Sequence, residues 1–309
     1  MKVLVTGGAG FIGSNIADAV IAKRHKAVIL DDLSSGKLNN VNGKAEFYKA
    51  DIVNEKAVFD IFKKEKPDAV IHCAAQIDVR KSVADPKYDA DINILGSLNI
   101  LKACVENNAK KIIFASSGGT IYGECGNKAP CEKTFPDPLS PYGIAKYCVE
   151  NYIKFYGEIH GLKYTILRYA NVYGPRQDPR GEAGVVAIFA GKMLNNEPVT
   201  VFGSGKQMRD YVYVSDVVEA NIGSLTKADN SIINIGTNKA VPLNEIVKIM
   251  SVISKTDKKP VYKKKREGEL FKSFLDNKKA LKKLGWRPEV DIKEGIKKTL
   301  LYFKKEALK

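Results

Sequence analysis

Residues 2–13 read KVLVTGGAGFIG, a short apolar stretch that runs directly into a glycine-rich turn. The apolar stretch predicts a buried strand, and the segment after the turn repeats apolar residues at helical spacing. Gly8, Gly10 and Gly13 satisfy the pattern GxGxxG between the two. The early glycines let a pyrophosphate approach backbone N–H groups, while Gly13 lets the helix pack closely on the strand. These residues predict a dinucleotide-binding unit.

A second expected strand, residues 27–30, ends at the acidic pair Asp31-Asp32. Those acids stand about 20 residues beyond the glycine turn, where dinucleotide-binding folds place a carboxylate on the ribose hydroxyls. Asp31 in that position would accept from both hydroxyls and would repel a 2′-phosphate. The sequence therefore predicts NAD rather than NADP.

Further short apolar runs alternate with helix-length segments along the first half of the chain. They lie at residues 46–49, 69–72, 111–115 and 164–168. This alternation predicts an α/β fold with a doubly wound parallel sheet of the Rossmann type. Beyond residue 168, Gly- and Pro-rich turns become frequent, and they indicate a smaller C-terminal substrate-binding α/β domain.

The run at residues 232–235 predicts a strand that returns to the first sheet, ahead of helices near 241–253 and 292–303. We expect two domains, each made of two segments of the chain. Residues 1–170 with about 214–238 are expected to form the NAD-binding domain, and residues 171–213 with 239–309 the second domain.

The 309 residues are 44% hydrophobic and 28% charged, which is typical of a globular protein. No apolar run approaches the roughly 18 residues that a membrane span needs, and no signal-peptide pattern is present, so a cytoplasmic location is expected. The five cysteines lack CxxC spacing, and no metal site is expected.

The formal net charge of +15 leaves a nucleic-acid partner to be considered. A nucleic-acid reader is expected to carry a docking motif or aromatic residues within a basic stripe, and neither occurs. A lysine-rich solvated surface explains the charge, and it would also attract a diphosphate ligand. We therefore expect a small-molecule substrate, with neither nucleic acid nor membrane as partner.

Tyr142 and Lys146 are four residues apart and share one face of a predicted helix. A cation beside a phenol favours the phenolate, so we expect Lys146 to lower the pKa of Tyr142 towards neutrality and make it a general base. Upstream, residues 114–123 read FASSGGTIYG, a strand entering a loop rich in hydroxyl groups and glycine. A hydroxyl there could pass a proton between substrate and Tyr142.

Two further stretches, YANVYGPR at residues 169–176 and RDYVYV at 209–214, complete a specific pattern. With the glycine-rich turn and the Tyr-Lys pair, they resemble the extended short-chain dehydrogenase/reductases, and most closely the bacterial and archaeal UDP-glucose 4-epimerases. The similarity runs the whole length of the chain. It implies an NAD-dependent enzyme that inverts C4 of a UDP-hexose, and a homodimer.

The resemblance also implies residue roles. The catalytic residues are Tyr142 as base, Lys146 as its pKa partner and ribose ligand, and Ser117. The NAD-binding residues are Gly7, Gly10, Phe11, Ile12, Asp31, Asp32, Ser35, Asp51, Ile52, Ala74, Ala75, Asn93, Tyr142, Lys146 and Tyr169. The UDP-sugar-binding residues are Ser117, Tyr142, Asn171, Val185, Phe202, Arg209, Arg266 and Glu269.

The chain departs from the family pattern in two places. Gly118 aligns with the usual catalytic Ser or Thr and has no hydroxyl, so Ser117 is the expected substitute and Thr120 the reserve. Glu269 stands where the family usually has an Asp that holds the uridine ribose, so that contact is expected to shift.

The loop sequence also separates reactions. Related dehydratases resemble Thr-Asp-Glu in this loop, and the chain has Ser117-Gly118-Gly119 instead, so elimination lacks its acid and base. Epimerisation through a transient 4-keto sugar remains, and UDP-N-acetylglucosamine or UDP-glucuronate are alternatives to UDP-glucose. A nucleotide sensor without turnover is a further alternative, although it would not need the Tyr-Lys pair.

Overall fold

The structure is a computed structural model that describes residues 1–179, 184–266 and 269–306. Its centre is a seven-stranded sheet of order β11-β6-β5-β4-β1-β2-β3, in which every pairing is parallel. The strands are β1 (Lys2–Thr6), β2 (Lys26–Asp31), β3 (Glu46–Lys49), β4 (Ala69–His72), β5 (Lys111–Ser117), β6 (Lys163–Tyr169) and β11 (Ser231–Ile235). The Rossmann-type prediction and the return of residues 232–235 to the first sheet are confirmed.

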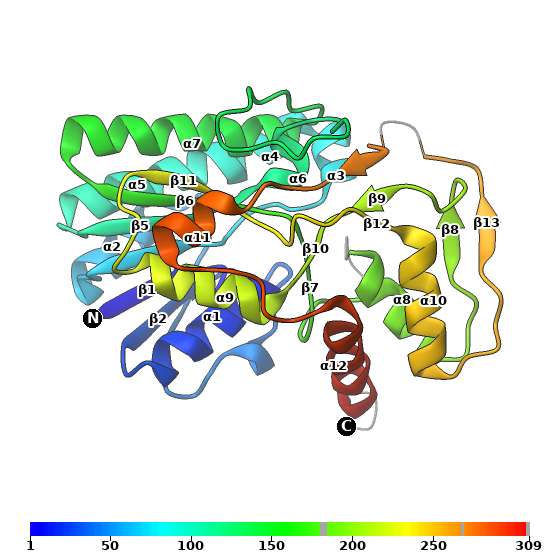
Figure 1. The fold of residues 1–309 in the computed structure, drawn as a ribbon. Helices are drawn as coiled ribbons and strands as arrows, with labels where there is room; N and C mark the ends of the chain where they lie inside the picture. Colours follow the sequence, from blue (N-terminus) through cyan, green and yellow to red (C-terminus); the bar gives the residue numbers. More distant parts are fainter. Residues whose placement is uncertain (180–183, 267–268, 307–309) are drawn as a thin grey trace.

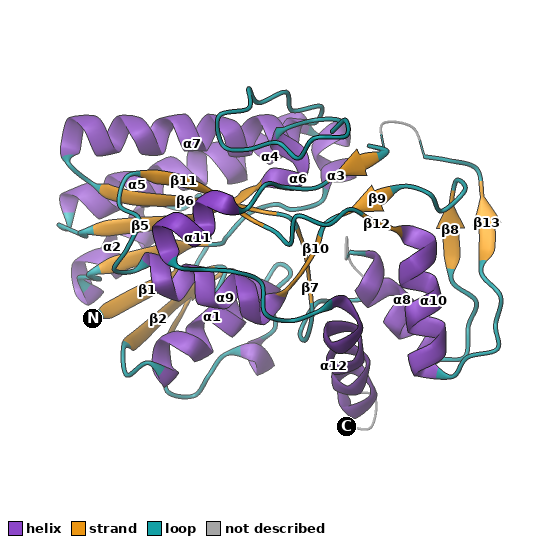
Figure 2. Cartoon of the chain, viewed as in Figure 1, coloured by secondary structure: helices purple, strands orange, loops and turns teal. Residues whose placement is uncertain are grey.

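Helices cover both faces of this sheet (Figures 1 and 2). They are α1 (Phe11–Ala22), α2 (Glu55–Glu65), α3 (Val79–Ala84), α4 (Pro86–Ala90), the π-helix η2 (Asp91–Gly96), α5 (Ser97–Glu106), α6 (Gly118–Ile121), α7 (Pro141–His160), α9 (Val214–Ser224) and α11 (Lys278–Leu284). One face packs against α2, α5 and α7, and the other against α1 and α9.

The two faces arise from the alternation of side chains along each strand. In β1, Leu4 joins the core beneath α2, α5 and α7, whereas Val3 and Val5 join the core beneath α1 and α9. All three side chains are fully buried, which explains why the strand is apolar throughout rather than alternating with polar residues.

The rest of the chain forms a second region, at the end of the sheet where the strands have their carboxyl ends (Figure 1). Its strands are β7 (Asn171–Tyr173), β8 (Thr200–Phe202), β9 (Met208–Arg209), β10 (Tyr211–Tyr213), β12 (Val241–Pro242), β13 (Val261–Lys263) and β14 (Lys272–Ser273). Its helices are α8 (Val185–Leu194), α10 (Leu243–Ser254) and α12 (Ile292–Glu306), and a short 3-10 helix, η1 (Leu38–Asn40), follows β2. The helix expected from residue 241 begins at Leu243, because Val241 and Pro242 pair with β9.

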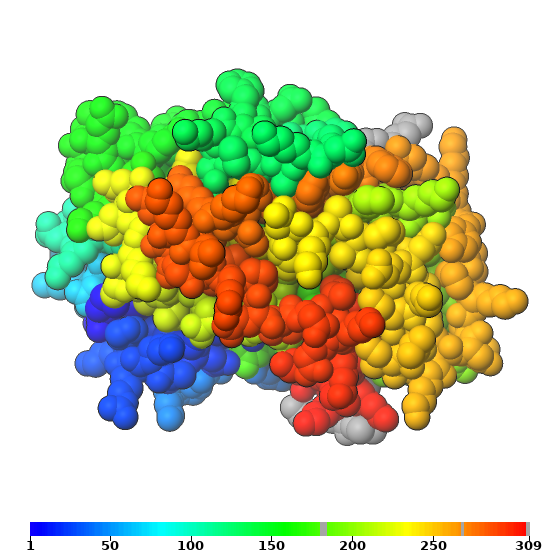
Figure 3. Space-filling model, in the orientation of Figure 1, coloured from blue at the N-terminus to red at the C-terminus, as the bar shows by residue number. Residues whose placement is uncertain are grey.

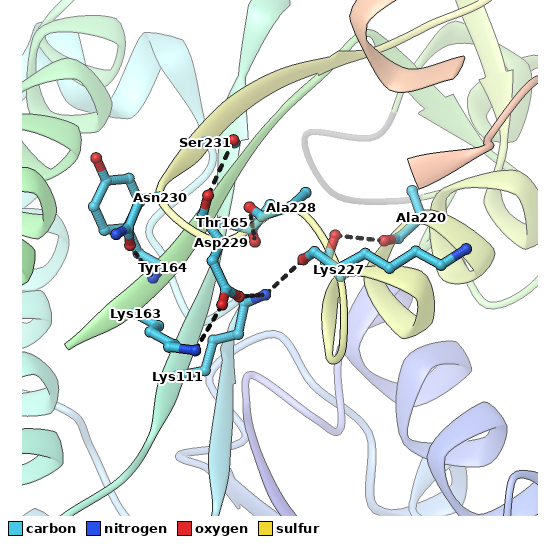
Figure 4. Close-up of polar contacts among 11 residues, drawn as sticks. Lys111, Lys163, Tyr164, Thr165, Ala220, Lys227, Ala228, Asp229, Asn230 and Ser231 are labelled. Atoms are coloured by element: carbon cyan, nitrogen blue, oxygen red, sulfur yellow. Dashed lines mark hydrogen bonds and ion pairs between the residues drawn. The ribbon is translucent and has the colours of Figure 1, made fainter. Parts of the chain in front are cut away.

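The loop before β11 is tied to the amino ends of β5 and β6 (Figure 4). The buried Lys111 amine donates to Asp229 Oδ1 at 2.7 Å and to the Lys227 carbonyl at 2.6 Å. Lys163 pairs with the other Asp229 oxygen at 2.9 Å. One carboxylate thus holds β11 in place beside β6, far from the carboxyl edge of the sheet.

No helix within the described ranges is long and apolar enough to cross a bilayer.

A buried ion pair anchors α7 to the sheet. Arg168 of β6 donates through Nε to Glu150 Oε1 at 2.9 Å and through Nη2 to Oε2 at 2.5 Å. Ser116 donates to the same carboxylate, and Arg168 also donates to the Tyr122 hydroxyl, which in turn donates to Asn234. The bidentate geometry and the additional bonds satisfy both charges inside the core.

We expect Glu150→Gln to destabilise the protein by about 3–5 kcal/mol, because the guanidinium of Arg168 stays buried without its counter-charge. Urea unfolding measures the effect. Glu158→Gln is the matched control, since Glu158 lies on the exposed side of the same helix. Equal midpoints for the two variants would contradict the anchoring role.

Candidate active site

The glycine-rich turn between β1 and α1 leaves backbone N–H groups available to an anion. Gly7 has φ +64, and a Cβ at this position would lie 2.8 Å from the Ala74 nitrogen, so only glycine is accommodated. Gly10 is the N-cap of α1 and supplies no side-chain hydrogen bond to the first turn. The uncapped helix end and the closely packed glycines fit the pyrophosphate of a dinucleotide.

The acidic pair at the end of β2 divides into a buried and an exposed carboxylate. Asp31 accepts from the Ala9 nitrogen at 2.9 Å and from the Leu33 nitrogen at 2.8 Å, which brings it under the glycine-rich turn. Burial raises its pKa, and the backbone hydrogen bonds oppose that shift. Asp32 is exposed and accepts from Ser34. Both lie beside the turn, as a ribose ligand requires.

The other residues expected at NAD follow the ends of neighbouring strands. Phe11 and Ile12 begin α1, Ser35 follows β2, Asp51 and Ile52 follow β3, Ala74 and Ala75 follow β4, and Asn93 lies in η2. The Ala74 nitrogen donates to Thr6 Oγ1 at 3.1 Å, which joins the loop after β4 to the end of β1. Tyr169 ends β6, and its hydroxyl bonds Asn221 of α9 at 3.0 Å. The carboxyl edge of the sheet thus gathers the expected cofactor residues.

The start of α7 places Tyr142 and Lys146 at the same edge. Ser140 is the N-cap, with its side chain accepting from the Gly143 nitrogen, and Pro141 is the first helical residue. The Tyr142 nitrogen donates to the hydroxyl of Ser82 in α3 at 3.2 Å. Lys146 follows one turn later and is buried, so both functional side chains sit on a helix end held by its own cap and by α3.

The electrostatics of this pair differ from the expectation. The Lys146 amine donates to the Ala115 carbonyl at 3.0 Å and lies 5.8 Å from the centre of the Tyr142 ring. Burial raises the pKa of Tyr142, Asp89 raises it further, and a hydrogen bond with Ser117 opposes both. Burial has the opposite effect on the amine, because it lowers the pKa of Lys146 to about 8. The predicted fall in the Tyr142 pKa is therefore wrong for the protein alone, because desolvation of the phenolate raises that pKa and the charge of Asp89 adds to it.

The loop after β5 distinguishes the three candidate positions for a second hydroxyl. Ser117 ends β5, and its interaction with the Tyr142 side chain lowers the Tyr142 pKa. A Cβ at Gly118 would lie 2.6 Å from a terminal methyl of Leu275, so a Ser or Thr at this position would require the Leu275 side chain to move. The Thr120 hydroxyl is buried and has no hydrogen-bond partner among the described residues. Of these three positions, Ser117 is the one whose side chain acts on Tyr142, and its part in proton transfer stays a prediction.

The residues expected at the UDP-sugar lie in the second region, across from Ser117. Asn171 begins β7, and a Cβ built on Gly119 would lie 3.8 Å from its Oδ1 and 4.0 Å from Ser117 Oγ. The Arg266 guanidinium stacks 3.7 Å from the centre of the Phe202 ring, at the end of β8. Val185 begins α8. The structure therefore brings Asn171 to the catalytic loop and pairs Arg266 with Phe202.

Arg209 and Glu269 are ion-paired at 3.7 Å. The Arg209 guanidinium also donates to the Leu270 carbonyl at 2.8 Å and the Met208 carbonyl at 2.9 Å, so it braces the segment that leads into β14. Glu269, which stands where the family usually has an Asp, is thus paired with Arg209, the residue expected to bind phosphate. A diphosphate there would meet a cation already held in place by carbonyl oxygens.

Two carboxylates that we did not predict hold the second region against the sheet. Buried Asp210 accepts from Thr237, Asn238 and the Leu275 nitrogen. Glu124, just beyond the catalytic loop, accepts from two backbone nitrogens of residues 271–272, both at 2.7 Å. Figure 3 shows the green loop that contains Glu124 lying along the orange segment before α11. Asp210 is part of the RDYVYV stretch, whereas Glu124 had no distinguishing sequence signal.

Comparisons with known proteins agree with this geometry. Residues 3–236 match the family model described as NAD dependent epimerase/dehydratase family. A protein of Methanocaldococcus jannaschii named putative UDP-glucose 4-epimerase is 50% identical over 98% of both chains.

Two solved structures are similar over nearly the whole chain. The UDP-glucose 4-epimerase of Thermotoga maritima with UDP-glucose has a TM-score of 0.98 and 50% identity, covering 99% of this chain and 100% of that one. The Thermus thermophilus UDP-glucose 4-epimerase in complex with NAD has a TM-score of 0.94 and 42% identity, covering 98% and 99%. With its glycine-rich turn, Tyr-Lys helix and parallel sheet, the chain belongs to the NAD-dependent epimerase/dehydratase family.

Proposed function

We propose that this enzyme interconverts UDP-glucose and UDP-galactose by inverting the configuration at C4. The observation that carries the proposal is the convergence of Ser117, Tyr142 and Lys146 at the sheet edge beside the uncapped end of α1. Similarity to the two solved UDP-glucose 4-epimerases supports the choice of sugar. A loop without an Asp-Glu pair supports epimerisation over elimination.

In the proposed reaction, Tyr142 removes the proton from the C4 hydroxyl and later returns it, with Ser117 passing the proton between sugar and phenol. Bound NAD would supply the hydride chemistry at C4, and its positive charge would favour the Tyr142 phenolate that burial alone opposes. Lys146 adds a second positive charge near the phenol. No net oxidation results. The 4-keto sugar must therefore stay in the site while it rotates to present its opposite face.

Strong contacts to UDP and few contacts to the hexose would allow that turn. We propose that Asn171, Arg209 and Arg266 hold the diphosphate and ribose, that Val185 and Phe202 line the uracil pocket, and that Glu269 takes part in binding ribose through its pairing with Arg209. Asp31, Asp32 and the glycine-rich turn would hold NAD. In this proposal, residues 1–170 with about 214–238 form the NAD-binding domain, and the remaining residues form the UDP-sugar-binding domain.

The function is tested by incubating the purified enzyme separately with UDP-glucose, UDP-N-acetylglucosamine and UDP-glucuronate and resolving the C4 epimers. We expect the main reaction to be the conversion of UDP-glucose to UDP-galactose. Tyr142→Phe should reduce turnover by at least about 100-fold, since general acid–base catalysis contributes roughly 10²–10⁴-fold. Bound NAD and the unfolding midpoint should not change. Wild-type turnover in this variant would refute the role of Tyr142, and absence of any epimer with all three sugars would favour a nucleotide sensor.

The two hydroxyl candidates give a separate test. Ser117→Ala should slow turnover more than Thr120→Ala, because Ser117 acts on the Tyr142 phenol, whereas the buried Thr120 hydroxyl has no hydrogen-bond partner among the described residues. Steady-state kinetics on UDP-galactose compares the variants at matched NAD content. The reverse order would move the proton relay to Thr120.

We also propose a homodimer, formed through neighbouring helices α5 and α7. Part of each helix packs inward, including Ile100 of α5 and Val149 of α7. The outer side of α7 nevertheless exposes Phe155 (51%) and Ile159 (61%), and Leu95 just before α5 is half exposed. Apolar residues gathered on adjoining helices are typical of a subunit interface.

Light scattering tests this assembly. The wild type should have twice the mass of one chain, and Phe155→Glu should lower the mass to that of a monomer because it places a charge in the apolar contact. Val252→Glu is the control, because Val252 is 72% exposed on α10 and away from α7. A monomeric wild type, or a dimer unaffected by Phe155→Glu, would rule out this interface.

A further inference from the structure

Four charged side chains are buried around α7: the cations Lys146 and Arg168 and the carboxylates Asp89 and Glu150. Glu150 is bonded twice to Arg168, so these two charges compensate each other. An uncompensated ion inside a protein is costly, and Lys146 therefore needs a second anion. Asp89 of α4 is the carboxylate left for this purpose among the described residues.

The contacts of Asp89 show a fixed carboxylate without a cation bonded to it. Its Oδ1 accepts from Gln76 Nε2 at 2.8 Å and from Asn93 Nδ2 at 2.9 Å, and both donors are neutral amides. Asn93 and Gln76 are locked to each other, since the Gln76 nitrogen donates to Asn93 Oδ1 and Asn93 Nδ2 donates to the Gln76 carbonyl. Asp89 thus joins the loop after β4 to η2, and its side chain cannot reorient freely.

The position of α4 brings this charge to the catalytic helix. Helices α3 and α4 pack against α7, and Ser82 of α3 accepts from the Tyr142 nitrogen. The negative charge of Asp89 raises the pKa of both Lys146 and Tyr142, so it favours the ammonium and disfavours the phenolate. One carboxylate therefore acts on both members of the pair.

The other titratable groups facing Lys146 do not replace Asp89. His72, at the end of β4, is bonded to Thr6 and Ser97, and burial lowers its pKa to about 3, so it is neutral. Burial raises the pKa of the Cys73 thiol, which is therefore neutral too. From α7 itself, Tyr142 is neutral at pH 7 and Glu150 is committed to Arg168.

We infer that Asp89 is a positioning residue for the proposed reaction: it is the counter-charge of the buried Lys146 ammonium, held in place by Gln76 and Asn93. The kinetic consequence rests on the proposed epimerase activity. The charge balance itself does not, because it concerns only side chains of this chain.

The kinetic test is Asp89→Asn, which keeps an oxygen to accept from both amides and removes the charge. In the pH profile of kcat, both limbs should move to lower pH, since Lys146 loses an anion that favours its ammonium and Tyr142 loses an anion that opposes its phenolate. Asp91→Asn, in the adjoining η2, is the control and should leave the profile in place. A uniform loss of rate with unmoved limbs would show that Asp89 has only a structural role and overturn the inference.

A second test needs no activity and separates failure of this inference from failure of the proposed function. Urea midpoints are measured at pH 7 for the parent, Asp89→Asn, Lys146→Met and the double variant. In the parent, Asp89→Asn should lower the urea midpoint, because it leaves the Lys146 ammonium uncompensated. In the Lys146→Met background, the same change should lower the midpoint much less, or raise it. Equal shifts in the two backgrounds would overturn the pairing of Asp89 with Lys146.

Discussion

The bidentate contact between Arg168 and Glu150 is the constraint on which the site depends. It fixes α7 to β6 in the core, and Ser116 and Tyr122 extend the same network to the two sides of the catalytic loop. Tyr142 and Lys146 lie two turns and one turn before Glu150 on this helix. Their positions relative to Ser117 therefore follow from how α7 is anchored, together with the bonds of the Tyr142 nitrogen to Ser82 and of the Lys146 amine to the Ala115 carbonyl.

Burial then creates an electrostatic problem that charge compensation has to solve. Removing the phenol and the amine from water favours their neutral forms, which opposes a base that must become phenolate and a cation that must assist it. The pKa of Tyr142 is raised in the protein alone, and that of Lys146 is lowered to about 8. The charge of Asp89 opposes the second shift.

The second region is joined to the sheet through a short list of carboxylates. Glu124 holds the backbone at the start of β14, Asp210 holds the Leu275 nitrogen, and Arg209 donates to the Leu270 carbonyl just before the residues that Glu124 holds. Leu275 in turn fills the space that a side chain at position 118 would need. The glycine in the catalytic loop is therefore coupled to the packing of the second region, and Ser117 is the hydroxyl that remains beside Tyr142.

The sequence by itself determined the Rossmann-type sheet, the NAD-binding turn and the Tyr142–Lys146 pair, because apolar alternation, glycine spacing and helical periodicity act over a few neighbouring residues. Only the tertiary structure decided the direction of the Tyr142 pKa, the pairing of Arg209 with Glu269, and the roles of Asp89, Asp210 and Glu124. Desolvation and charge pairing depend on residues far apart in the chain, and an isolated carboxylate in a sequence gives no sign of which cation or backbone amide it will meet once folded.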